Sequence, residues 1–301
     1  MTGTTLNNRK HWSAIRYPLW FIIPGIVLYT LFFIVPTLNG FYYSMTDWSS
    51  NSGDDISFVG FNQFAEVWKN PDLGTAFKNT IIYSVTITIL KNVLGLLLAL
   101  ALNEKIKTRN ALRAAFFSPM ILNVVAMGLI FRGLLDPYDG FVNNTLRTIG
   151  LDFLALGWIG DVNLSIHMVS LMEIWRATGV AMAIFLAGLQ TIPKDCNEAA
   201  RIDGASYWQT FKSVTLPLLG PAITINVLLS LIYGFRMFEV IYFLTQGGPG
   251  SSSQVFMTMA YKYMGMGLYG YSAAINVILV LLNCAVAIPI LIYLRKREVE
   301  L

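Results

Sequence analysis

Residues 189–223 read LQTIPKDCNEAARIDGASYWQTFKSVTLPLLGPAI, and this largely polar stretch lies between two strongly apolar segments. Pro193 is well placed to begin a helix that has a basic and an acidic residue in its first turn. Gly204 then ends or bends that helix, because glycine tolerates the backbone angles of a helix end. A second short helix is predicted over residues 207–214. A few polar residues would suffice to join two apolar segments, so this connection is predicted to be a structured element.

Six apolar segments surround this connection, and each is long enough to cross a membrane. A helix needs about 20 apolar residues to span the hydrocarbon core. Backbone polar groups in lipid must be satisfied within the segment, so we expect helices, and none of the segments shows the alternation of a barrel strand. The sequence therefore predicts an all-α integral membrane protein with six transmembrane helices. They are Leu19–Tyr43, Phe77–Leu102, Ala114–Leu135, His167–Leu189, Leu218–Leu244 and Ser272–Leu294.

The composition agrees with a lipid-facing chain and excludes several functions. Of 301 residues, 55% are hydrophobic and 13% are charged, about half the charged share of a soluble domain. Two cysteines and two histidines give neither a disulfide framework nor a metal-ligand pattern. The net charge of +4 does not indicate nucleic-acid binding, because in a membrane protein the positions of the lysines and arginines relative to the spans are the informative quantity. No nucleophile–base pair points to an enzyme, and no Walker sequence for ATP occurs.

Basic residues gather at both ends of the chain and in two of the five connections. The other three connections are richer in acids, including Asp54 and Asp139. By the positive-inside rule, both termini and the 189–223 stretch face the cytoplasm. The predicted organisation is a cytoplasmic tail over 1–18, a membrane domain over 19–294 that contains a cytoplasmic loop at 190–217, and a second tail over 295–301. The basic set is Arg9, Lys10, Arg16, Lys105, Lys107, Arg109, Arg113, Lys194, Arg201, Lys212, Arg295, Lys296 and Arg297.

The cytoplasmic connection resembles a known signature. Its Glu-Ala-Ala at 198–200, Gly204 four residues later and Leu216-Pro217 are similar to the EAA signature of ABC-importer permeases. The match extends through IPKD before it and DGA within it. LTQGGPGSSS at 244–253 resembles a second stretch of the binding-protein-dependent sugar permeases, in the group represented by the larger maltose permease subunit.

This resemblance implies a type I ABC-importer permease fold in the bacterial cytoplasmic (inner) membrane. It implies that the EAA loop is a coupling helix that docks on a cytoplasmic ATPase; a hairpin with no partner is the alternative. The implied partners are a second homologous permease, two ATPase subunits that bind the ATP, an extracytoplasmic solute-binding protein and a sugar. This chain itself would then hold no cofactor. The implied coupling residues are Glu198, Ala199, Ala200, Asp203, Gly204 and Tyr207.

Charged residues inside the predicted spans are expensive to insert, so each is a candidate for function. Lys91 lies near the middle of the second span. Glu173 and Arg176 are three residues apart on the fourth span, as are Arg236 and Glu239 on the fifth. These pairs are predicted either to cross-link the two helices as a structural network or to contact the substrate.

One face of the fifth span combines hydroxyls, an amide, an aromatic ring and a glycine gap, which suits a sugar. Its residues are Asn226, Ser230, Tyr233, Gly234 and Met237, and the last four align with the sugar-lining face of the similar permeases. Arg176, Ala177 and Val180 match the opposite wall by the same resemblance, but that wall lacks the family's aromatic side chain here. Arg176 joins the five as a predicted substrate contact. Ordinary helix packing is the alternative for the face. Asn276 and Asn283 are weaker candidates.

The predicted function is therefore that of a membrane permease subunit of an ATP-driven sugar importer, with an oligosaccharide favoured. Alternatives are an ABC permease for glycerol phosphate or another solute, an ion-coupled secondary transporter, and a membrane anchoring protein without transport. A secondary transporter would be expected to show inverted repeats and broken half-helices. Residues 254–265 are predicted to form either an amphipathic helix at the outer interface or an ordered loop.

Overall fold

The computed structural model describes residues 19–52, 55–104 and 106–298. The predicted tail over 1–18, Asp54, Lys105 and residues 299–301 lie outside the described residues. The chain divides into two units, residues 1–42 and 43–301, and each is described by itself. In the described residues the regular structure is helical, apart from an isolated bridge between Thr46 and Phe58.

The first unit contains α1 (Ile23–Tyr29), a π-helical turn over Thr30–Ile34 and most of α2 (Val35–Tyr43). Pro24 and Pro36 lie in the first turns of α1 and α2, where proline is tolerated. The segment Ile23–Tyr43 is strongly apolar, and none of its residues is buried by other parts of the protein. A helix that is apolar all round is typical of a membrane span.

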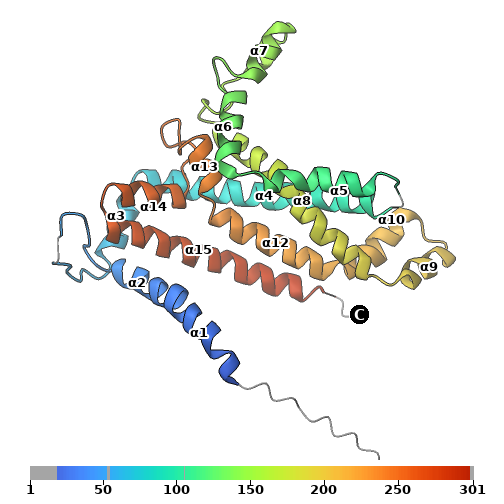
Figure 1. The fold of residues 1–301 in the computed structure, drawn as a ribbon, viewed down its shortest axis with the longest axis horizontal. Helices are drawn as coiled ribbons and strands as arrows, with labels where there is room; N and C mark the ends of the chain where they lie inside the picture. The colour runs from blue at the N-terminus through green and yellow to red at the C-terminus, as the bar shows by residue number, and fades with distance from the viewer. Residues whose placement is uncertain (1–18, 53–54, 105, 299–301) are drawn as a thin grey trace, which may run out of the picture. The chain divides into compact units, whose positions relative to one another are not determined.

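The second unit is an assembly of helices, drawn in Figure 1. Its helices are α3 (Asn62–Lys69), α4 (Asp72–Asn103), α5 (Arg109–Phe117), α6 (Val124–Leu134), α7 (Phe141–Thr148), α8 (Ser165–Thr191), α9 (Lys194–Ile202), α10 (Tyr207–Thr210), α11 (Leu216–Leu218), α12 (Gly220–Phe235), α13 (Glu239–Leu244), α14 (Phe256–Gly265) and α15 (Tyr269–Arg295).

Four of the six predicted spans are long apolar segments in the structure: Ile23–Tyr43, α4, α8 and α15. The other two are bent. Arg109–Ile121 and Val124–Leu134 meet at 94°, and Tyr207–Leu218 and Gly220–Phe235 meet at 68°. The described part of the chain therefore has four apolar helical spans, or six if each bent pair is one span.

The predicted span Ala114–Leu135 is broken within its length. Pro119 lies in a 3₁₀ turn over Ser118–Ile121, and the chain is extended at Leu122. Asn123 then starts α6, since its side chain accepts a hydrogen bond from the backbone N–H of Val125 at 2.8 Å. In Figure 1, α6 rises away from α5 and carries α7 with it.

The predicted span Leu218–Leu244 is also interrupted. Pro221 lies in the first turn of α12, which ends at Phe235. The chain leaves helical geometry at Arg236 and at Phe238, and α13 begins at Glu239. This break places Arg236, Met237 and Phe238 beside the cavity described below.

Helix α8 is the centre of the second unit. In its apolar window 72% of residues are buried, against 33% in α4 and 11% in α15. Small residues let its neighbours approach: Gly95 of α4 lies against Ala181, and Gly179 lies against the backbone of Phe116. Close backbone contact through small residues is the usual way in which helices associate in membranes.

The connections on the predicted outer side contain ordered structure. Residues 254–265 do form a helix, α14, which packs against α15 through Met259 and Ala260. Residues 136–166 include α7, and Asn143 holds two parts of this segment together. Its side-chain amide donates to the carbonyls of Pro137 and Leu156, and its side-chain oxygen accepts a hydrogen bond from Trp158. The backbone N–H groups of residues 138 and 139 lower the pKa of Asp136 by hydrogen bonding to its carboxylate.

Candidate functional site

The EAA segment folds as the two predicted helices. Pro193 is the N-cap of α9, which ends at Ile202. Gly204 has a φ of +80°, which only glycine adopts easily, and the N–H of Ala205 donates back to the carbonyl of Ala200 at 3.0 Å. This closure reverses the chain between α9 and α10.

Helix α10 is begun by Ser206 and Gln209, which form a capping box: each side chain bonds to the other's backbone N–H, at 3.4 and 2.7 Å. A π-helical turn over Phe211–Thr215 and then α11 lead toward α12. The short elements therefore have local sequence causes, which explains why they were predictable.

The surface of this segment exposes apolar side chains. Ile202, Tyr207 and Trp208 are 86%, 69% and 67% exposed. Of the six predicted coupling residues, Ala200 is half-buried and the other five are exposed. Ile202 was not predicted to be a contact residue, although an apolar residue at the end of an otherwise polar helix is a signal for one. Large exposed aromatic and aliphatic side chains are typical anchors of a protein interface.

A second candidate site is a cavity of about 640 Å³ between α4, α8, α12 and the break after α12. Its wall is apolar, with two aromatic rings and five charged side chains. The lining residues are Lys91, Met120, Glu173, Arg176, Ala177, Val180, Leu229, Ile232, Tyr233, Arg236, Met237, Phe238, Glu239 and Met257. A volume in this range suits a small organic ligand.

Glu173 and Arg176 form a bidentate ion pair in the cavity wall. The Nε and Nη2 atoms of Arg176 donate to the two carboxylate oxygens of Glu173 at 2.8 and 3.0 Å. Glu173 is 1% exposed and Arg176 is 4% exposed. Two charges tolerate such burial only when they are paired with good geometry, so each residue requires the other.

Arg176 also joins α8 to α12. Its Nη2 donates to the hydroxyl of Tyr233 at 2.6 Å, and its Nη1 lies 3.1 Å from the sulfur of Met120. The predicted cross-link between the fourth and fifth spans therefore exists, but it runs through a tyrosine. The described residues include no ion pair between Arg236 and Glu239, which are exposed beside the break. Because α12 ends at Phe235, these two residues do not share a helical i, i+3 spacing, so they form no structural cross-link with each other. Both line the cavity, and the alternative of a substrate contact stays a prediction.

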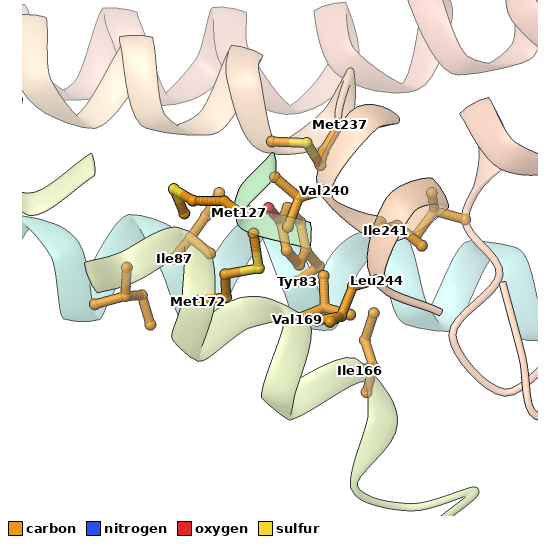
Figure 2. Packing of buried hydrophobic residues seen from close by; sticks show 12 residues of the cluster. Tyr83, Ile87, Met127, Ile166, Val169, Met172, Met237, Val240, Ile241 and Leu244 are labelled. Atoms are coloured by element: carbon orange, nitrogen blue, oxygen red, sulfur yellow. The ribbon is translucent and has the colours of Figure 1, made fainter. Parts of the chain in front are cut away.

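The floor of the cavity meets a buried cluster of large apolar side chains. Met237 belongs both to the cavity wall and to this cluster. Figure 2 shows Met237 near Val240 and above Tyr83, with Met127 and Met172 beside them. The cluster holds α4, α6, α8 and the segment after α12 together, so the position of Met237 is fixed by packing from several elements.

The predicted sugar face divides into two groups. Tyr233 and Met237 line the cavity. Asn226 and Ser230 are buried against other helices: Asn226 donates to the carbonyl of Ala181 on α8 at 3.3 Å, and Ser230 accepts from Asn92 of α4 at 3.1 Å.

Gly234 is the third residue of the face that packs against a helix instead of the cavity. A Cβ atom at this position would lie 2.9 Å from the Cα of Ser84. Asn226, Ser230 and Gly234 therefore do not line this cavity, and their contact with a substrate stays a prediction. Helical spacing shows which residues share a face, but the neighbouring helices α4 and α8 decide what covers it.

The remaining candidates are placed as follows. Ala177 and Val180 line the cavity, as does Lys91. Asn276 donates to the carbonyl of Ser272 within α15 at 3.1 Å, and Asn283 is also on α15; neither lines this cavity. In the part of the chain that the structure describes, no group of histidine, cysteine, aspartate and glutamate side chains could hold a metal ion.

Comparison with known proteins relates this chain to a family of transport proteins. Residues 91–297 match the family model of the binding-protein-dependent transport system inner membrane component. The chain is 32% identical over 292 residues to the multiple sugar-binding transport system permease protein MsmF of Streptococcus mutans, covering 96% of this chain and 97% of that protein. It is 31% identical to the trehalose/maltose transport system permease protein MalF of Thermococcus litoralis, covering 85% and 86% of the two chains.

The fold is also that of a solved transporter subunit. A chain of a bacterial ABC transporter involved in the import of the acidic polysaccharide alginate superposes with a TM-score of 0.79 over 92% of this chain and 94% of its own length, at 23% identity. The predicted ABC-importer permease fold is thereby confirmed. With the family model covering most of the chain and the relatives covering nearly all of it, this protein belongs to the inner membrane components of binding-protein-dependent transport systems.

Proposed function

We propose that this chain is the permease subunit of an ATP-driven importer of a sugar, and that it forms one half of the translocation path. The observation that carries the proposal is the cavity between α4, α8 and α12, where polar and charged groups lie beside the rings of Tyr233 and Phe238. Sugars present hydroxyls that need hydrogen-bond partners and ring faces that pack on aromatic planes. The names of relatives that transport sugars support the same class.

The contacts within the cavity suit weak, reversible binding. Tyr233 is held by Arg176, and Met237 is held by the buried cluster, so both present fixed surfaces to a solute. Fixing side chains in advance reduces the entropy lost on binding. Arg176 supplies the only predicted cationic contact, with one Nη1 that bonds to no oxygen among the described residues. A permease site needs modest affinity, because tight binding would slow release.

The proposed partners follow from the exposed α9–α10 segment and the absence of a Walker sequence from this chain. Two cytoplasmic ATPase subunits bind the ATP and receive α9 and α10, whose exposed Ile202, Tyr207 and Trp208 supply apolar contacts. A second homologous permease completes the path, and an extracytoplasmic binding protein delivers the solute. Under this proposal the chain has no enzymatic activity and no cofactor of its own, and both of its termini are cytoplasmic.

Transport in reconstituted vesicles tests this proposal. The complete complex would be inserted in proteoliposomes with its binding protein, and uptake of labelled mono- and oligosaccharides measured. We expect uptake that requires ATP and the ATPase subunits on the side that carries α9. Uptake that follows a proton or sodium gradient without ATP would instead identify an ion-coupled transporter. ATP-dependent uptake of glycerol phosphate with no sugar uptake would retain the importer and change its substrate.

A further inference from the structure

The cavity contains one buried cation that forms no ion pair with any acidic group of the described residues. Lys91 lines the cavity from α4 and is 8% exposed. It makes no hydrogen bond or ion pair with any described residue, although an uncompensated charge at membrane depth is costly. The side chain is therefore a group that the chain's own structure leaves unsatisfied.

The one buried acid of the cavity, Glu173, is shared between Lys91 and Arg176, and its direct contacts are with Arg176. Both carboxylate oxygens of Glu173 already accept hydrogen bonds from Arg176. Glu239 is exposed beside the break, together with the equally exposed Arg236. Three cations and two carboxylates line the cavity, so its net charge is one positive charge. Lys91 is the buried cation of this set that has no ion pair.

Arg176 adds directional donors beside this charge. Glu173 and Arg176 both lie close enough to Lys91 to interact with it electrostatically, with opposite signs. The Nη1 of Arg176 contacts a methionine sulfur but no oxygen. An ammonium and a free guanidinium N–H at one wall are the donors that a carboxylate or a phosphate binds best. The rings of Tyr233 and Phe238 and the thioether of Met257 line the rest of the same space.

We propose that the transported solute is an anionic glycoside, with its carboxylate or phosphate group bound by Lys91 and Arg176 and its sugar ring packed on Tyr233 or Phe238. This inference rests on the proposed function and narrows its substrate class. The anion neutralises Lys91 when it binds, so a neutral sugar of the same shape leaves that charge unpaired and binds more weakly.

Three matched probes test the proposal on the complete complex in nanodiscs, with the second permease and ATPase subunits present. Galactose, galacturonate and galactose 6-phosphate share one ring stereochemistry and differ in charge. Their affinities for the permease would be compared by saturation-transfer-difference NMR at millimolar concentrations. We expect at least one of the two anions to bind about tenfold more tightly than galactose, as for one charge-assisted hydrogen bond. The tighter of the two identifies the carboxylate or the phosphate as the natural group.

Variants assign the preference to Lys91. Lys91→Met should remove the preference for the anion while galactose still binds, and Lys91→Arg should retain it. Lys78→Met is the matched control, because Lys78 is an exposed lysine on the same helix that does not line the cavity. It should leave all three affinities unchanged.

Four results would overturn the proposal. Equal binding of all three probes would refute the anionic class and leave the sugar importer standing. Binding of none would remove the sugar cavity of the proposed function as well. A preference for the anion that persists in Lys91→Met would place the anion elsewhere. Loss of the second permease from the purified Lys91→Met complex would show that an acid of that partner neutralises Lys91.

Discussion

At the level of single residues, the buried ion pair between Glu173 and Arg176 is the feature most sensitive to substitution, because each charge needs the other. Both side chains are almost completely buried, and Arg176 also donates to Tyr233 and contacts the sulfur of Met120. Removing one partner of such a pair leaves the other charged and buried, whereas replacing both by apolar residues is often tolerated. The pair is therefore required for the position of Tyr233 as well as for stability.

Glu173→Gln should destabilise the protein by about 3–5 kcal/mol, because Arg176 then stays buried without its counter-ion. The double variant Glu173→Leu with Arg176→Met should recover most of that loss and still transport poorly, since Tyr233 loses its donor. Thermal unfolding of the purified complex in detergent measures the first effect, and uptake measures the second. Additive losses in the double variant would show that the two residues do not act as a pair.

Tyr233 and Gly234 are neighbours in sequence with different surroundings. Tyr233→Ala removes a ring from the cavity, so we expect weaker uptake with the complex intact and ATP hydrolysis retained.

Gly234→Trp forces a large side chain against the backbone of Ser84, so we expect loss of the folded protein, with uptake and ATP hydrolysis falling together. Membrane abundance and ATPase activity separate the two results. A stable Gly234→Trp complex that hydrolyses ATP would contradict the packing role.

At the scale of elements, the α9–α10 pair depends on the reversal at Gly204. Nothing lies within 4 Å of a Cβ at this position, so the positive φ is what limits substitution, and space is not. A β-branched residue is strained there, and asparagine adopts the same angle more readily. The reversal sets where Ile202 and Tyr207 stand relative to each other on the exposed surface.

Gly204→Val should leave the protein in the membrane and reduce ATPase recruitment, because the strained turn displaces α10. Gly204→Asn is the matched control and should retain most recruitment. Glu198→Lys should also weaken recruitment, through reversed charge on an exposed face of α9. Co-purification of the ATPase with the tagged permease measures all three. Normal recruitment by both Gly204→Val and Glu198→Lys would place the docking surface elsewhere.

For the whole molecule, the number of membrane crossings depends on whether each of the two bent helix pairs crosses the membrane. If each bent pair crosses the membrane once, the chain crosses six times and both ends share one side. The positive-inside rule then predicts α9 in the cytoplasm and residues near Asp139 outside. A pair that re-enters without crossing would place these two segments differently.

After replacement of Cys196 and Cys284, a cysteine at position 139 should react with a membrane-impermeant maleimide added outside intact cells. A cysteine at position 195 should react only after the cytoplasmic side is opened. Labelling is read by gel shift, and uptake by the cysteine-free protein is the control. Labelling of both positions from the same side would overturn the six-crossing topology.

Features that depend on local chemistry could be predicted from the amino-acid sequence. Apolar length predicted where the helices lie, and the proline, glycine and serine of the EAA segment predicted its two short helices. The residues 198–204 and 244–253 also led to the family, because a family signature is a linear pattern. All of these follow from neighbours along the chain.

What each helix face contacts depends on the packing of helices that are distant in sequence. Asn226, Ser230 and Tyr233 share spacing and polarity on α12, yet α4 and α8 cover the first two and leave the tyrosine at the cavity. The bend at 122–123 has local causes instead, since Pro119 lies in the 3₁₀ turn and Asn123 caps α6. The periodicity of a helix fixes which side chains share a face, but burial and charge pairing are set by residues far away in sequence.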